Sequence, residues 1–245
     1  MMPARPILQV VLAAVAIAAV IGLFDVTDID LWVQDHFFDF KTGQWLVDRK
    51  EPVARTIFYT GPKVALWAVG IGCAAGVVAS VRHERFRRWR RGCALTALSI
   101  VLVPLSVALL KNVTNVYTPH QTARYAGDKP YVKVLGRYPP GFVAERRGLG
   151  FPASHAAAGF ALMVQAFALR RRAARRVGLA VGLAAGCVMG AYQTVNGQHF
   201  LSHTIVSMLI AWIIIVALAA TVGRAGWLNE NAASGSGPSL ISDTP

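Results

Sequence analysis

The sequence predicts an all-α polytopic membrane protein, a bundle of six transmembrane helices with one long loop on its outer face. Of its 245 residues, 55% are hydrophobic and only 15% are charged, a balance typical of chains that cross a bilayer several times. Six apolar runs approach or exceed the roughly 20 residues that a helix needs to span a hydrocarbon core. In chain order, the expected spans are Ile7–Phe24, Ile57–Val81, Cys93–Leu110, His155–Leu169, Val177–Thr194 and Phe200–Val222.

The first span follows a basic start, "MMPAR", which also begins many signal peptides. No small-residue cleavage site follows in "VIGLFDVTD", so we interpret this span as a membrane anchor. Residues 1–228 are then expected to form a single six-span membrane domain. Residues 229–245 are low in apolar content and rich in Gly and Ser, and they are expected to form a disordered tail.

Two short connectors contain most of the clustered arginines. "RHERFRRWRRG" contains six and "RRRAARR" contains five, and each lies directly beside expected spans. Because short basic loops remain on the cytoplasmic side, these connectors and both termini are expected inside, with three connectors outside. Contact with anionic lipid explains such runs better than nucleic-acid binding does, so no nucleic-acid partner is expected.

The first two outer connectors differ in character. Residues 25–55 interleave aromatic side chains with acids, which suits an amphipathic helix lying in the membrane interface. Residues 111–154 form the longest non-apolar stretch and contain many of the prolines and glycines. A loop of this length without periodicity is usually either functional or disordered, and we expect it to be an outer active-site loop.

One helical face of the fifth span carries glycine at every fourth position in "VGLAVGLAAGCVMG". Small residues at this spacing let neighbouring helix backbones approach closely in lipid. Packing within the bundle is the main expectation, and a homo-oligomer seam is the alternative. The face consists of Gly178, Gly182, Gly186 and Gly190.

Two histidines lie at the outer end of the last span, where ionisable groups are costly and usually mark function. On a helix, His199 and His203 share a face because they are four residues apart. Three interpretations are open: interfacial anchoring, a metal site, or a nucleophilic histidine held by its neighbour. The zinc-protease pattern needs Glu directly after the first His, but Phe200 stands there without a nearby carboxylate, so no metal is expected.

The start of the fourth span, "GFPASHAAAGF", combines features of an anion site. Pro152 and Ser154 are typical of a helix N-terminus, where free N–H groups and the helix dipole favour an anion such as phosphate. His155 in that first turn would provide the bound anion with a proton donor.

The outer end of the third span, "LKNVTNVYTPH", places Lys111 where an apolar run ends. Such a lysine often extends its ammonium to the interface as an anchor. The functional alternative is an ammonium that pairs with phosphate, and Asn115 adds a further polar group nearby.

Taken in order, these three stretches resemble the motifs of the type 2 phosphatidic acid phosphatase superfamily, K-x6-R-P, P-S-G-H and S-R-x5-H-x3-D. Lys111 corresponds to the first motif, His155 to the second and His199 to the third, and the likeness in layout extends over about residues 57 to 222. The third stretch is most similar to bacterial members that read G-x-H-F-L-S. The resemblance implies a bacterial inner membrane protein with its site facing the periplasm.

The resemblance also implies roles for these residues. His199 would attack phosphorus and form a phosphohistidine, and His155 would protonate the leaving lipid oxygen. Lys111 and backbone donors near Ser154 would stabilise charge on the phosphoryl oxygens. His203, in place of the family's aspartate, would hold the His199 ring and fix its tautomer. Water would then release phosphate without a metal or cofactor.

Two arginines of the family pattern are missing, because Thr118 and Gln193 occupy their positions. An arginine binds phosphate through a planar fork of donors that neither residue reproduces. Candidate replacements lie in the outer loop at Arg124, Arg137, Arg146 and Arg147. Arg146 and Arg147 are expected first, because they lie only a few residues before the second motif. The expected substrate-binding residues are Lys111, Ser154, Asn115, Gln193, Arg146 and Arg147.

The sequence thus predicts a lipid-phosphate phosphatase acting on a membrane lipid such as lipid A, an isoprenyl pyrophosphate or phosphatidylglycerol phosphate. A phosphotransferase that passes the phosphoryl group to a second lipid would use the same residues. A catalytically impaired protein that binds a lipid phosphate is a further alternative, because the motif arginines and aspartate are replaced. The expected partners are this lipid substrate and the bilayer.

Overall fold

The structure, a computed structural model, describes residues 4–224, and the tail expected at residues 229–245 lies outside them. The long helices are α1 (Ala4–Val26), α4 (Gly61–Arg82), α5 (Glu84–Thr114), α8 (Arg172–Val195) and α9 (Leu201–Arg224). The shorter elements are α2 (Ile29–Asp35), β1 (Phe38–Asp39), β2 (Gln44–Trp45), α3 (Pro52–Arg55), the π-helical turn η1 (Thr56–Thr60), the 3-10 turns η2 (Pro119–Gln121), η3 (Ala123–Tyr125) and η4 (Ala161–Val164), α6 (Ser154–Phe160) and α7 (Gln165–Ala168).

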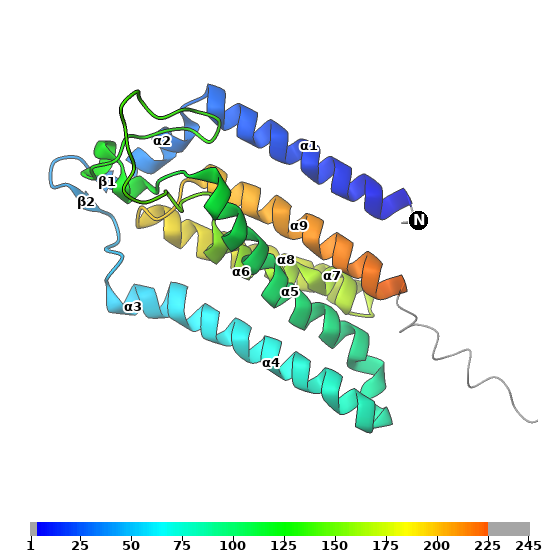
Figure 1. Cartoon of the computed structure of the whole chain (residues 1–245). Coiled ribbons are helices and arrows are strands. Elements are labelled where there is room, and N and C mark those ends of the chain that lie inside the picture. Colours follow the sequence, from blue (N-terminus) through cyan, green and yellow to red (C-terminus); the bar gives the residue numbers. More distant parts are fainter. Residues whose placement is uncertain (1–3, 225–245) are drawn as a thin grey trace, which may run out of the picture.

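Within residues 4–224, five helical segments are long and apolar enough to cross a membrane. They correspond to the first, second, third, fifth and sixth expected spans. They are Arg5–Val26, Pro52–Arg82, Glu84–Thr114, Arg172–Val195 and Leu201–Val222. Figure 1 shows these helices side by side in one elongated bundle, which confirms the prediction of an all-α membrane protein.

Large apolar side chains remain exposed on the outer faces of this bundle. On α1, Leu8 and Leu12 are 57% and 58% exposed, and on α4 the exposed side chains include Val64 and Ile71. Apolar surface of this extent is unfavourable in water and is covered by lipid tails in a membrane. The exposed faces of α1 and α4 therefore face the hydrocarbon core.

The fourth expected span is a shorter helical segment, Ser154–Ala168, composed of α6, η4 and α7 in succession. At 1.5 Å per residue it is about 22 Å long, less than the hydrocarbon thickness of about 30 Å. It lies inside the bundle, where Phe160 and Val164 are buried in the same cluster as Leu95 and Ile215. The total of six spans stays a prediction.

The glycine face of α8 (Gly178, Gly182, Gly186 and Gly190) is buried inside the chain. It packs against the helical segment Ser154–Ala168 and against α9. A Cβ atom at Gly186 would lie 2.0 Å from the Phe160 ring. Any larger side chain would push these helices apart. The face is filled within one chain, which agrees with the main expectation of packing within the bundle, and a homo-oligomer stays a prediction.

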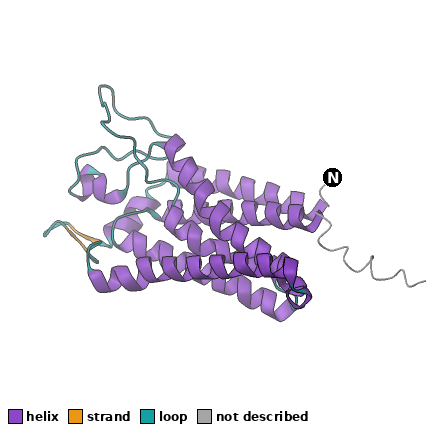
Figure 2. Ribbon diagram, turned by 60° about the horizontal axis from the view of Figure 1, so that its bottom comes forward, coloured by secondary structure: helices purple, strands orange, loops and turns teal. Residues whose placement is uncertain are grey.

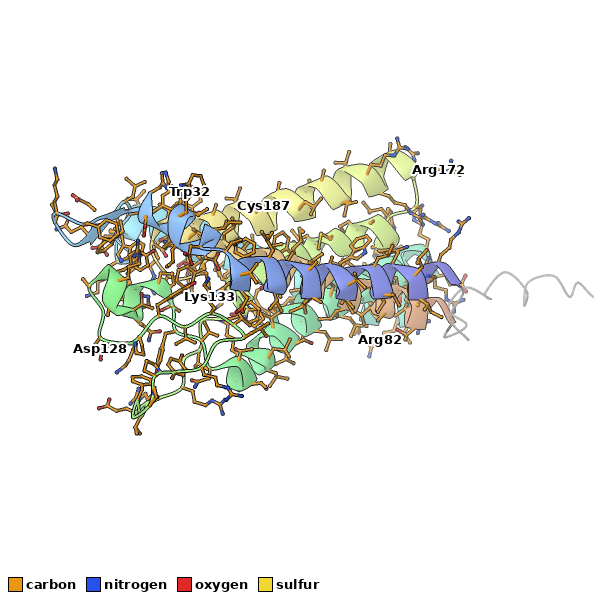
Figure 3. All side chains as sticks on the ribbon, turned by 90° about the horizontal axis from the view of Figure 1, so that it is seen from above. Trp32, Arg82, Asp128, Lys133, Arg172 and Cys187 are labelled. Carbon is orange, nitrogen blue, oxygen red and sulfur yellow. The ribbon has the colours of Figure 1, made fainter. Side chains whose placement is uncertain are left out.

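The two ends of the bundle carry different connectors. Figure 3 shows Arg82 and Arg172, from the two arginine-rich connectors, at the end where the N-terminal helix begins, with Trp32 and Asp128 at the opposite end. In Figure 2, the longer loops gather at that opposite end. All outer connectors therefore meet at one end of the bundle, which we call the loop end.

The first outer connector is not a single interfacial helix. It folds into the short helix α2 and an antiparallel pair of strands, β1 and β2, in which Phe38 is paired with Trp45. Phe38 is buried against Tyr125 and Phe200 rather than against lipid. The expected single amphipathic helix over residues 25–55 was therefore wrong. Phe38 and Trp45 pack on other loops of the protein, whereas Trp32 and Phe40 remain 66% and 55% exposed.

The long outer loop returns to the end of α5 and is fixed there by backbone contacts. The Tyr138 hydroxyl donates to the Asn115 carbonyl at 2.7 Å. The amide of Gly150 donates to the Val116 carbonyl at 2.6 Å. These bonds bring the start of α6 beside the end of α5, which is the arrangement that the functional site requires.

Candidate active site

A cavity of ≈ 460 Å³ lies at the loop end, where the ends of α5, α6 and α8 meet the turn before α9. Its size falls in the range of small-molecule sites, about 300–1,000 Å³. Five residues singled out from the sequence line it together. They are Lys111, Ser154, His155, Gln193 and His199. One ammonium and two imidazoles from three separate helix ends therefore converge on a single space.

His199 lies in the turn between α8 and α9 and is only 5% exposed. The turn passes through Gly197 at φ 73°, and the amide of His199 donates to the Gln193 carbonyl at 3.1 Å. Burial holds the pKa of His199 well below its ordinary value, and the charge of Lys111 and the neighbouring His203 lower it further. The imidazole is therefore neutral at neutral pH, the form in which a histidine acts as a nucleophile.

His203 lies one turn further along α9 and does not line the cavity. Its ring centroid lies 5.7 Å from that of His199, and Phe151 and Phe200 also pack against its ring. In the described part of the chain, no hydrogen bond joins the two imidazoles, and the backbone carbonyl of Gly150 interacts with both of them. His203 thus positions the His199 ring by packing, and the expectation that it fixes the tautomer has no bond to support it.

His155 lies in the first turn of α6 and is held by the π-helical turn η1. Its Nε2 atom donates to the Phe58 carbonyl at 3.3 Å, and its ring stacks on Tyr59 with centroids 4.3 Å apart. A π-helical turn often occurs at a functional site because it shifts the side chains that follow it. Here it places a carbonyl and an aromatic ring against the imidazole, which fixes the ring in the cavity wall.

Lys111 and Ser154 complete the predicted core of the site. Lys111 is in the last turn of α5, where its charge reaches His199 across the cavity. Ser154 is the first residue of α6, and the preceding amide, of Ala153, donates to the Ser207 hydroxyl of α9 at 2.8 Å. The start of α6 is therefore attached directly to the helix that follows His199.

The two predicted amide residues have different places. Gln193 is buried at the cavity wall, and its side-chain oxygen accepts a hydrogen bond from Asn196 at 3.3 Å. Asn115 ends α5 in a left-handed conformation, and its side-chain oxygen accepts the Gly148 amide at 2.8 Å. Asn115 does not line the cavity. It holds the outer loop in place, so its assignment to substrate binding is corrected.

The two arginines expected to replace the motif arginines lie outside the cavity. Arg147 donates to the Val113 carbonyl at 3.2 Å, and the Arg146 side chain is exposed. Thr118, at one motif arginine position, is buried and bonds the Gln121 side chain at 2.9 Å. The expectation for Arg146 and Arg147 was wrong, because the loop that carries them folds back on the end of α5.

Three other cations line the cavity in their place: Arg49, Lys50 and Arg55. All three come from the first outer connector, in "VDRKEPVAR", and Tyr59 of η1 lines the same wall. The sequence offered one weak signal for them, a basic cluster at the outer end of a span. Nothing in the three motifs pointed to this segment.

The first outer connector is docked onto the turn that carries His199. Gln34 is fully buried, and its side-chain nitrogen donates to the Thr194 carbonyl at 2.7 Å. The Trp45 ring covers Gly197, where an added Cβ atom would lie 2.4 Å from the ring. Any side chain at Gly197 would displace the Trp45 ring, so the ring can approach this closely only because glycine has no side chain.

Asp30 of α2 fixes the start of α9. It is 6% exposed, and its carboxylate accepts the Ser202 amide at 2.9 Å and the Ser202 hydroxyl. Burial raises the pKa of Asp30 to about 6, although the bonds from Ser202 and the charge of Lys133 oppose the shift. The carboxyl group thus holds its proton more tightly in the folded protein than in the unfolded chain.

We expect Asp30→Asn to remove a pH-dependent part of the stability. Because the folded protein binds this proton more tightly than the unfolded chain, Asp30 contributes on the order of 2 kcal/mol to the free energy of unfolding. The contribution is fully present below about pH 4 and is lost as the pH rises through 6. Melting temperatures in detergent between pH 4 and 7, as the difference between wild type and variant, measure it. Asp28→Asn is the matched control, an exposed carboxylate that pairs with Lys133 at 2.9 Å. A difference curve without slope for Asp30→Asn would contradict the assignment.

The fold and the cavity together define an integral membrane protein with a cationic, histidine-lined site at one end of a helical bundle. The family model described as the PAP2 superfamily matches residues 92–227, more than half of the chain. The chain therefore belongs to the PAP2 superfamily, which confirms the family predicted from the motifs. Membership implies phosphatase-type activity on phosphate esters, which in this family are often lipid phosphates.

No curated protein and no solved structure matches the chain. The matched range contains Lys111, His155 and His199, but it begins after the first outer connector and so does not include it. The cations at Arg49 and Arg55 therefore belong to a part of the chain that the family match does not cover.

Proposed function

We propose that this protein is a lipid-phosphate phosphatase that removes phosphate from a membrane lipid through a phosphohistidine at His199. The observation that carries the proposal is a pair of adjoining cavities. A second cavity of ≈ 420 Å³ lies beside the first, and Tyr59, Ser154 and His155 line both. A lipid phosphate fits this arrangement, with its headgroup in the polar cavity and its tail in the other.

The second cavity is suited to an apolar chain. It lies between α4 and α5, and its lining is mostly hydrophobic, with Leu66, Trp67, Ile100 and Leu105 among the side chains. Burying apolar surface contributes about 25 cal/mol per Å². Because α4 also faces the hydrocarbon core, a lipid enters from the side without leaving the membrane.

In the first chemical step, a lone pair of the His199 imidazole forms a bond to phosphorus. The bond from phosphorus to the lipid oxygen breaks, and that oxygen takes a proton from His155, which binds this proton from solvent when the phosphate anion enters the cavity beside it. Lys111 stabilises the charge on the remaining phosphoryl oxygens. The products are a free lipid alcohol, or a lipid monophosphate from a diphosphate, and a phosphohistidine.

In the second step, water attacks phosphorus and gives a proton to the now neutral His155 imidazole. The bond between phosphorus and the His199 nitrogen breaks, and its electron pair returns to the imidazole. Inorganic phosphate leaves, and His155 is again protonated for the next cycle. The two histidines thus return to their starting states without an added cofactor.

The expected location is a bacterial inner membrane, with the loop end of the bundle facing the periplasm. The two arginine-rich connectors at the opposite end support this orientation, because such loops remain in the cytoplasm. Lipid A, an isoprenyl pyrophosphate and phosphatidylglycerol phosphate all present a phosphate at a membrane surface and are the proposed substrates.

The experiment is phosphate release from these lipids by purified protein in detergent, with and without a chelator. The proposal predicts release that the chelator does not change. Loss of activity with chelator would indicate a metal-dependent hydrolase, and binding without release would indicate a non-catalytic lipid-phosphate binder. Transfer of phosphate to an added lipid alcohol, in place of release, would identify a phosphotransferase.

Filling the apolar cavity with a larger side chain should raise KM for long-chain lipid phosphates but not for short-chain esters. Ala108 of α5 lines the apolar cavity with an exposed side chain, so Ala108→Trp fills it without disturbing the core. We expect KM for a long-chain lipid phosphate to rise about 10-fold, with little change for a short-chain, water-soluble ester. Leu98→Trp, on the same helix outside the cavity, is the control. Equal effects on both esters would argue against the tail cavity.

A further inference from the structure

Within residues 4–224, the active-site cavity is lined by four basic side chains of Lys and Arg and by no carboxylate. Lys111 comes from the family motif, and Arg49, Lys50 and Arg55 come from the first outer connector. Like charges that share a small space repel one another unless an anion lies between them. The charge of this cavity therefore favours an anionic guest, and most of that charge originates outside the motifs.

Within residues 4–224, no carboxylate forms an ion pair with the connector cations Arg49, Lys50 and Arg55, although Arg49 also lies near His120. Within residues 4–224, the side chains of Arg49 and Lys50 form no hydrogen bond or ion pair. Arg55 lies 5.8 Å from the centroid of the Tyr59 ring, which also lines the cavity. By contrast, Arg124 is bound by Asp35 through two hydrogen bonds, at 2.9 and 2.6 Å.

The acids closest to these cations in the sequence bind backbone groups instead. The Glu51 side chain caps α3 by accepting the Val53 amide at 3.0 Å and the Ala54 amide. The Asp48 carboxylate accepts the Lys50 amide at 2.8 Å. Each carboxylate thereby orders the segment without neutralising a guanidinium in the cavity.

The segment is held at a defined place beside His199. Trp45, four residues before Arg49, covers Gly197, which lies two residues before His199. On the other side, Arg55 is directly followed by η1, whose Phe58 carbonyl accepts the His155 hydrogen bond. The stretch that carries both arginines is therefore anchored to both histidines of the proposed reaction.

We propose that Arg49 and Arg55 bind the phosphoryl oxygens of the substrate, in place of the two motif arginines that Thr118 and Gln193 have replaced. The proposal rests on the proposed function for the identity of the guest, and its chemistry is that of any phosphate group in this cavity. A guanidinium offers two parallel donors to a phosphate, which neither a threonine nor a glutamine side chain does. In this protein the phosphate clamp, by which we mean Arg49 and Arg55, is located on the docked first outer connector rather than at the helix ends that carry the family motifs.

The test uses inorganic phosphate and the full-length protein in detergent. Isothermal titration calorimetry at low salt should show binding by wild type and a dissociation constant about 10-fold higher for Arg49→Ala/Arg55→Ala, a modest loss because both side chains are partly in solvent. Arg49→Lys/Arg55→Lys, which keeps the charge but not the fork, should be intermediate. The salt dependence of binding should also become shallower in the double alanine variant.

The matched control is Lys41→Ala/Arg137→Ala. It also removes two positive charges from exposed positions in the outer connectors, but neither residue lines the cavity. Its binding of phosphate should stay within twofold of wild type. Equal weakening in both double variants would mean that phosphate responds only to the net charge of the protein, and this result would overturn the proposal. Unchanged binding in Arg49→Ala/Arg55→Ala would overturn it as well.

The outcome is distinguishable from that of the proposed function. Phosphate binding that depends on Arg49 and Arg55, with no release from any lipid phosphate, would contradict the phosphatase activity and support the clamp. Release of phosphate from a lipid, together with phosphate binding that is unchanged in Arg49→Ala/Arg55→Ala, would support the phosphatase activity and contradict the clamp. Circular dichroism and elution volume confirm that each variant is folded before binding is compared.

Discussion

His199→Ala is expected to lower the turnover of a lipid phosphate by on the order of 10⁴-fold, because the reaction loses its nucleophile. The imidazole is buried at the cavity wall and is neutral at neutral pH, so it offers a lone pair that alanine lacks. Lys111 and the connector cations remain in place. Release of phosphate, measured over hours to reach low rates, should fall while the dissociation constant for inorganic phosphate changes by less than about threefold.

The control for this variant is His36→Ala. His36 lies at the same end of the molecule, where its Nδ1 atom bonds the Trp32 carbonyl at 2.7 Å, but it does not line the cavity. Its activity should equal that of wild type. Turnover by His199→Ala within 10-fold of wild type would exclude a phosphohistidine at this position, whatever the other residues do.

His155→Ala is expected to slow the reaction by about 10²- to 10⁴-fold, the usual contribution of a general acid. The effect should depend on the leaving group. A lipid alkoxide needs a proton as it leaves, whereas a nitrophenolate leaves readily without one. Turnover of nitrophenyl phosphate should therefore fall much less than that of a lipid phosphate in the same variant.

This dependence separates proton donation from a merely structural role. His155 also stacks on Tyr59 and bonds the Phe58 carbonyl, so its removal loosens the wall of the cavity. Loosening would slow both substrates alike. An equal loss for the lipid phosphate and the nitrophenyl ester would assign His155 to positioning and leave the reaction without a proton donor.

The helical bundle was predictable because hydrophobic length is a local property of the sequence. The expected third span, Cys93–Leu110, lies within α5, and the last, Phe200–Val222, coincides with α9 to within two residues at each end. The fourth was less predictable, because a helix that is buried among other helices is as apolar as one that faces lipid. Composition alone does not show that η4 interrupts it or that it is short.

The motif residues of the site were also predictable, since each of Lys111, His155 and His199 lies at the end of an apolar run. The phosphate clamp proposed at Arg49 and Arg55 was not. Its place depends on contacts between segments far apart in the chain, such as Gln34 with Thr194. No local pattern records such a contact, and Arg146 and Arg147 were preferred only because they are near the second motif in sequence.

The central claim is that phosphorus becomes bonded to His199 during turnover. Mixing the protein with a lipid carrying radioactive phosphate, quenching in alkali, where phosphohistidine survives, and mapping the label by peptide mass spectrometry tests this directly. The account predicts label on the peptide that contains His199, more of it when hydrolysis is slowed at low temperature, and none in His199→Ala. Label on another residue, or steady phosphate release with no labelled protein at any time, would contradict it.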